Sequence, residues 1–197
     1  MDWQNAIFAP GWVWSMLSMV LVVGTLVGIY RQLRLQSAQG AREQLETLDR
    51  EWNTERFDRC KLEVLLVLRD SKDATAVPRA AATAIATYWE RIAALTDGGH
   101  IDLKLLHSFN GGAVPVWWVA LAPFIRKLRA QNADPTEYLG FARLAESMAV
   151  LDRQTGASAF DEELLRSQLD HRIATYHDRI RLEESLRSAT RPAAAAS

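Results

Sequence analysis

The chain has a single cysteine, Cys60, among 197 residues, so it forms no internal disulfide. A lone thiol is typical of proteins in a reducing compartment. Motifs for phosphate loops (GxxxxGK[ST]), dinucleotides (GxGxxG) and serine hydrolases (GxSxG) are also missing. The four histidines show neither HExxH nor Cys/His zinc spacing. These absences favour a non-enzymatic protein without metal or cofactor.

Excess positive charge is lacking as well. The formal net charge is −1, which argues against binding of nucleic acid through bulk charge. We therefore expect no nucleic-acid partner.

One long apolar run stands out against these absences. Residues 12–30, WVWSMLSMVLVVGTLVGIY, contain no charged side chain. About 20 such residues span the hydrocarbon core of a bilayer as a helix. Trp12, Trp14 and Tyr30 suit the aromatic belts at the two membrane interfaces. The run predicts a transmembrane helix.

The flanking charges predict the orientation of this helix. Arg31 and Arg34 follow it directly, while Asp2 is the only side-chain charge before it. Basic flanks stay in the cytoplasm, where the arginines would contact the anionic leaflet. A cleaved signal peptide has the opposite charge order and a shorter apolar core. We expect a single-pass protein of the inner (plasma) membrane with its N-terminus outside.

Gly24 and Gly28 form a GxxxG pair inside the run. This spacing lets a second helix approach closely and is typical of membrane dimers. Glycine is also common in membrane helices, so the pair has two interpretations, a homodimer contact or an incidental feature.

The remaining chain predicts an all-α protein. Apolar residues recur at helical spacing, glycine pairs and prolines separate the segments, and no alternating strand pattern occurs. Asp134, with Pro135 and Glu137 after it, predicts the N-cap of one of these helices. The expected organisation is a short external N-terminus (1–11), a transmembrane helix (12–30), a juxtamembrane stalk helix (31–52), a cytoplasmic helical bundle (53–188) and a disordered tail (189–197).

The stalk has two interpretations. Ala38, Ala41, Leu45, Leu48 and Trp52 recur at spacings of three and four residues, as in a coiled-coil seam. Two heptads are few for a coiled coil, and an amphipathic helix resting on its own domain has the same pattern.

Two features are candidates for an interaction surface. Glu90, beside Trp89 on an apolar helix, is expected to pair with Arg126 or Arg129 and to orient two helices. Residues 113–125 are uncharged and are followed by basic residues. They form either a helix that docks on the inner leaflet or a buried core helix. The candidate residues are Glu90, Trp117, Trp118, Arg126, Lys127 and Arg129.

Three short stretches resemble a known family. They are Tyr88-Trp89-Glu90-Arg91-Ile92, Gly98-Gly99-His100-Ile101-Asp102, and Trp117-Trp118 with the following PFIRKLR segment. Bacterial proteins with one N-terminal span and a cytoplasmic helical domain of unknown function are similar over about residues 45–150. The resemblance implies this topology and provides no catalytic residues.

These observations predict a membrane-anchored helical module for protein–protein interaction or scaffolding, with an unidentified cytoplasmic protein and membrane lipid as partners. One alternative is an enzyme or effector with a site around Glu90, His100, His107 and Arg126. Another is an accessory subunit of a larger membrane complex.

Overall fold

The computed structural model describes residues 11–71, 73–156 and 160–190, and only the backbone of residues 11–13, 33–42 and 189–190. The described chain is all-α, as expected, and contains no strand. Its helices are α1 (Gly11–Trp52), α2 (Glu55–Asp70), α3 (Arg79–Asp97), α4 (Leu103–Asn110), α5 (Ala113–Asn132), α6 (Leu139–Gln154) and α7 (Glu162–Thr190).

The chain divides into two compact units, Met1–Gln44 and Leu45–Ser197. In the first unit, residues 14–32 of α1 are all exposed, and the stretch Trp14–Gln32 has a mean hydropathy of 1.5. This stretch is long and apolar enough to cross a membrane. Its Thr25 hydroxyl donates to the Leu21 carbonyl at 2.7 Å, which satisfies the hydroxyl within the helix.

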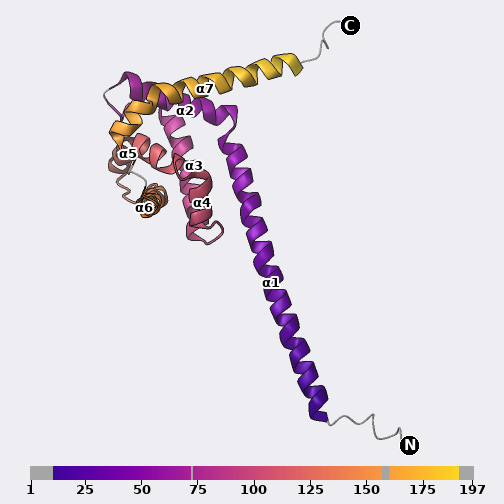
Figure 1. Cartoon of the computed structure of the whole chain (residues 1–197). Coiled ribbons are helices and arrows are strands. Elements are labelled where there is room, and N and C mark those ends of the chain that lie inside the picture. The colour runs from indigo at the N-terminus through magenta and orange to yellow at the C-terminus, as the bar shows by residue number, and fades with distance from the viewer. Residues whose placement is uncertain (1–10, 72, 157–159, 191–197) are drawn as a thin grey trace, which may run out of the picture. The chain divides into compact units, whose positions relative to one another are not determined.

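The second unit is a helical bundle with one core. Helix α2 lies along α7 and also packs on α3, while α3 and α5 both pack on α6 (Figure 1). Trp89, Trp117, Phe141 and Met148 are among its largest fully buried side chains. Burial of large apolar side chains is the main favourable term in folding.

Trp52, the last residue of α1, is the centre of an aromatic cluster. Its ring lies 4.6 Å from Tyr88, 5.0 Å from Trp89, 5.6 Å from Phe57 and 5.8 Å from Trp117, measured between centroids. Stacked and edge-on pairs at these distances add to the free energy of burial. The cluster joins the end of α1 to α2, α3 and α5.

Three positions of the predicted stalk pattern lie in this core. Leu45, Leu48 and Trp52 are each less than 8% exposed, so the last two turns of α1 rest on the bundle of their own chain. Ala38 and Ala41 lie outside the residues whose side chains are described.

The uncharged segment 113–125 forms most of α5, and α5 is a core helix. Trp117 is 2% exposed, and half-buried Trp118 places its ring edge-on against Phe141 at 5.2 Å. Taken together, α4 and α5 are also long and apolar enough to span a membrane, but the chain bends by 84° between them. Trp117 is therefore not part of an exposed surface.

The predicted N-cap at Asp134 is wrong. Helix α6 begins at Leu139, after Tyr138 with a left-handed φ of 54°. Asp134 instead accepts hydrogen bonds from the backbone N–H and the hydroxyl of Thr136 at 2.8 and 2.6 Å. This local turn offers the backbone an alternative to a helix.

Trp52→Ala is expected to lower the free energy of unfolding by about 3–5 kcal/mol, because it removes the ring that four others contact. Phe109→Ala is the matched control. Its ring is 70% exposed, so its loss should cost less than about 0.5 kcal/mol. Denaturant unfolding of the full chain in detergent, followed by circular dichroism, measures both. Equal effects of the two substitutions would contradict this description of the core.

Candidate functional site

Side chains cap the C-terminal end of α1 by donating hydrogen bonds to its last carbonyls. The last carbonyls of a helix have no partner within it. The Asn53 amide group donates to the Asp49 carbonyl at 2.9 Å, and the Thr54 hydroxyl donates to the Glu51 carbonyl at 2.8 Å. The Trp52 carbonyl is satisfied differently, by a side chain from α2.

Lys61 of α2 supplies that side chain. Its Nζ donates to the Trp52 carbonyl at 2.5 Å and to Asp58 Oδ1 at 2.9 Å. The ammonium also lies 4.0 Å from the centroid of the Trp52 ring and 5.2 Å from that of Tyr176. A cation at a helix C-terminus is stabilised by the helix dipole, and the ring faces add a cation–π contribution. Lys61 and Asp58 are both 0% exposed.

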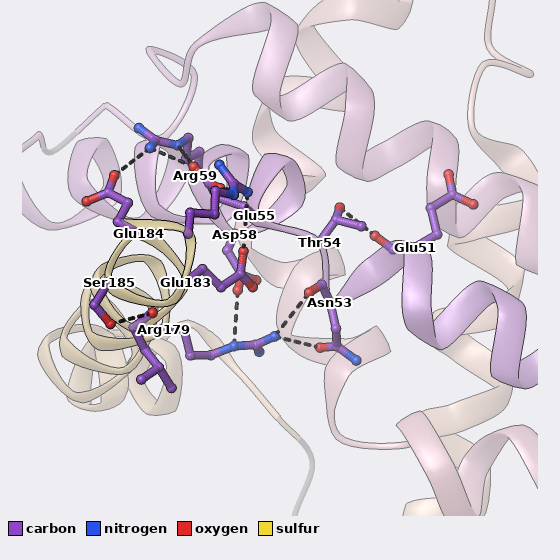
Figure 2. Close-up of polar contacts among 12 residues, drawn as sticks. Glu51, Asn53, Thr54, Glu55, Asp58, Arg59, Arg179, Glu183, Glu184 and Ser185 are labelled. Atoms are coloured by element: carbon purple, nitrogen blue, oxygen red, sulfur yellow. Dashed lines mark hydrogen bonds and ion pairs between the residues drawn. The ribbon is translucent and has the colours of Figure 1, made fainter. Parts of the chain in front are cut away.

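Arg179 connects this pair to α7. Its Nε lies 3.1 Å from Asp58 Oδ2, and its Nη2 donates to Asn53 Oδ1 at 3.1 Å. Figure 2 shows Arg179 reaching from α7 toward Asn53 and Asp58. We call Asn53, Asp58, Lys61 and Arg179 the junction cluster. It compensates a buried carboxylate with two cations and joins three helices at one point.

Burial is the largest influence on the pKa of Lys61, the lysine of the junction cluster. It lowers the pKa of Lys61 to about 8 from its ordinary value of 10.5, although the bond to Asp58 acts in the opposite direction. Burial also raises the pKa of Tyr176, whose ring faces Lys61.

A second set of charges lies on the surface beside the junction cluster. Glu55 pairs with Arg59 at 2.7 Å, and Arg59 also pairs with Glu184 at 2.8 Å (Figure 2). Glu55 pairs in addition with Arg187 of α7. These pairs hold the first turns of α2 against the C-terminal turns of α7. Hydrogen bonding to Arg59 lowers the pKa of the Glu55 carboxyl.

An open groove of about 600 Å³ lies at this surface, lined by Thr54, Glu55, Arg56, Arg59, Cys60 and Arg187. Burial raises the pKa of the Cys60 thiol above its ordinary value of 9.0. The thiolate is the reactive form of cysteine, so this environment makes Cys60 a poor nucleophile.

Sequence reasoning did not identify the junction cluster. The available signal was Lys61, which lies on the apolar stripe of α2 between Phe57 and Leu65, with Asp58 three residues before it. Opposite charges at that spacing share a helix face. The contribution of Arg179 depends on the packing of α7 and has no local signal.

Glu90 was predicted as a candidate residue, but its expected arginine partner is wrong. Its carboxylate accepts the backbone N–H groups of Gly140 at 3.0 Å and Phe141 at 2.6 Å. It thus satisfies the N-terminus of α6, where negative charge is favoured. Gly140 permits this approach, because a Cβ there would lie 2.8 Å from Glu90 Oε1.

The predicted basic residues lie apart from this contact. Arg129 Nε donates to the Glu137 carbonyl at 2.8 Å, and Lys127 Nζ donates to the Thr75 hydroxyl at 3.3 Å. Arg126 is exposed. Of the predicted surface, Arg126 and Lys127 lie at the exterior and Trp117 does not.

The histidines proposed for an enzymatic site have separate surroundings. His107 Nε2 lies 2.8 Å from Asp152 Oδ1 of α6, and His100 is exposed in the turn after α3. The groove beside α2 is lined by neither histidine. Among the described residues, no group of three or more His, Cys, Asp or Glu side chains is arranged to hold a metal ion.

In the first unit, Trp14, Tyr30 and Arg31 are exposed, and open space surrounds the position of a Cβ at Gly24 and at Gly28. The side chains of Trp12 and Arg34 lie outside those described.

Comparison with protein families places most of the chain in a known family. A model described as "Domain of unknown function (DUF4760)" matches residues 18–148. The matched region begins inside the apolar stretch of α1 and ends within α6, so it includes Asp58 and Lys61 but not α7. No curated protein and no solved structure matches the chain significantly.

Glu90→Ala is expected to lower the free energy of unfolding by about 2 kcal/mol, because it leaves two buried N–H groups of α6 without an acceptor. Glu146→Ala removes an exposed glutamate from α6 itself and should change stability by less than about 0.5 kcal/mol. Denaturant unfolding in detergent measures both variants. A Glu90→Ala protein as stable as the control would show that the carboxylate does not cap α6.

Stability should rise with pH where Lys61 titrates. The folded chain loses this proton near pH 8 and the unfolded chain near 10.5. The unfolded state therefore binds more protons in between, and the free energy of unfolding increases across that window. We expect the free energy of unfolding of the wild type, minus that of Lys61→Met, to increase by about 2 kcal/mol from pH 8 to pH 10.

Taking this difference removes the contributions of titrating groups that do not interact with Lys61. Lys127→Met, which removes an exposed lysine, is the matched control for the loss of one positive charge. A flat profile for Lys61→Met would mean that Lys61 keeps its ordinary pKa in the folded protein.

Proposed function

Because the chain belongs to the DUF4760 family, a domain of unknown function, we propose its role from its own structure: it is a single-span membrane protein whose helical bundle binds other proteins. Membrane attachment is the first part of this proposal, and protein binding is the second.

The observation that carries the proposal is the exposed apolar helix. None of the stretch Trp14–Gln32 is buried within the chain. Its exposed side chains include Leu17, Leu21 and Leu26 at 55–68%. Water does not solvate a continuous apolar surface of this length favourably. A bilayer does, and the helix satisfies its own backbone hydrogen bonds there.

The proposed orientation follows from charge. Arg31 and Arg34 lie at the C-terminal end of the apolar stretch, which favours a cytoplasmic position for everything that follows. The location is then the inner (plasma) membrane, with the N-terminus outside. The single cysteine fits a bundle kept in the reducing cytoplasm.

A binding role for the bundle is supported by how its buried polar groups are used. Glu90 caps the N-terminus of α6. Lys61 caps the C-terminus of α1 and balances the negative charge of Asp58. These groups stabilise helix ends and hold the helices in place. The arrangement favours a scaffold with fixed geometry over a catalytic centre, which needs polar groups converging on a cleft.

The first unit offers a self-association face. Gly24 and Gly28 are one turn apart on an exposed helix with no neighbour at either position. Close helix approach at such a face is how GxxxG pairs form dimers in lipid. The proposed assembly is a homodimer through α1, and an accessory position in a larger complex would use the same face.

Membrane topology is tested with Cys60→Ser protein that carries one new cysteine, either Asn5→Cys or Ser197→Cys. A membrane-impermeant maleimide added to spheroplasts should label position 5 and leave position 197 unlabelled until the membrane is permeabilised. Intact mass of the purified chain separates an anchor from a signal sequence. Loss of about the first 30 residues, or labelling of position 197 in intact cells, would refute the anchored topology.

Partner binding is tested by affinity purification in mild detergent with mass spectrometry. Proteins that co-purify with the full chain and also with a chain lacking residues 1–30 bind the bundle. Gly24→Leu and Gly28→Leu should abolish crosslinked dimers in membranes, while Val23→Leu serves as the control. Dimers that persist in both glycine variants would rule out this face, and a full chain that recovers no protein would refute the binding role.

A further inference from the structure

Helix α4 is attached to the bundle by few contacts. Leu106 is its one fully buried residue, Leu103 and Leu105 are partly buried against the core, and the helix packs chiefly on α6. Within the described part of the chain, its one side-chain hydrogen bond to another helix joins His107 Nε2 to Asp152 Oδ1 at 2.8 Å. By comparison, α3 and α5 each bury eight or more residues. Elements with so few buried contacts are the ones that open locally below the cost of global unfolding.

Both ends of α4 contain glycine. Gly99, before the helix, has a left-handed φ of +71°, a conformation that glycine adopts without strain. Gly112, after the helix, has an ordinary right-handed backbone, and no atom lies within 4 Å of where its Cβ would be. Neither packing nor conformation of the closed structure therefore requires glycine at position 112.

The neighbouring glycine is different and serves as a contrast. A Cβ at Gly111 would lie 2.4 Å from the His107 carbonyl oxygen and 3.0 Å from His107 Cδ2. Glycine at 111 lets the chain turn tightly under His107 and places the imidazole beside α6. Position 111 thus shapes the closed turn, whereas position 112 has no such role in it.

From these observations we propose that α4 is a latched flap. It opens from the bundle as one unit by rotation at Gly99 and Gly112. The His107–Asp152 hydrogen bond, the buried Ile101 and Leu106, and the partly buried Leu103 and Leu105 hold it closed. Opening exposes the Leu106 side chain near Phe109, which is already 70% exposed. The device is independent of membrane attachment and of the proposed partner binding.

Hydrogen–deuterium exchange of the full chain in detergent tests the flap. In the wild type, amides of residues 103–110 should exchange faster than those of α5 and α6. His107→Ala should accelerate exchange in α4 by about fivefold, the factor expected for one lost hydrogen bond, without changing α3, α5 or α6. Asp152→Asn, a milder change, should act in the same direction. Arg143→Ala breaks an exposed bond from α6 to Asp97 of similar length, 2.7 Å, and should leave α4 unchanged.

The hinge has its own variant. Gly112→Ala fits the closed structure and restricts the backbone at the hinge, so it should slow exchange in α4 by about two- to fivefold. The proposal is overturned if wild-type α4 exchanges together with α5 and α6, or if His107→Ala accelerates all helices equally. It is also overturned if Gly112→Ala leaves exchange in α4 unchanged.

Discussion

The buried carbonyl end of α1 is the constraint on which the bundle depends. A helix that ends inside a core leaves acceptors that water cannot reach, and each unmet one is costly. Lys61 meets the acceptor of Trp52, but a buried ammonium needs a counterion of its own. Asp58 supplies it, and Arg179 compensates the second oxygen of Asp58. One helix terminus thus fixes how α2 and α7 lie against the end of α1.

The same reasoning explains Glu90. A glutamate next to a buried tryptophan has the features of a catalytic acid, yet its two oxygens accept the first N–H groups of α6. Helix termini carry partial charges, so a bundle with short connections needs charged side chains at buried ends. Perturbed or buried charges in this protein are therefore better evidence of how the helices are joined than of chemistry.

The contrast between α4 and the other helices bears on how such a bundle works. Helices joined by buried charges and by rings around Trp52 hold a fixed geometry. Helix α4 is joined by one side-chain hydrogen bond to another helix, by the buried Leu106 and by the partly buried Leu103 and Leu105. A scaffold with one weakly attached element can change its surface there without disturbing its core, since local opening follows local contact density.

The sequence by itself determined the helical class, most helix positions and the apolar stretch of α1, because helical periodicity and hydropathy are local properties. It also marked Trp117 and Glu90 as unusual. It misplaced the start of α6 at Asp134, since an Asx-type turn and an N-cap use the same residue types. Only the tertiary structure decided that Glu90 caps α6, that α5 is buried and that Arg179 completes the junction cluster. Those partners are 50 residues or more apart along the chain, and which distant groups meet depends on packing of the whole core, which no local pattern records.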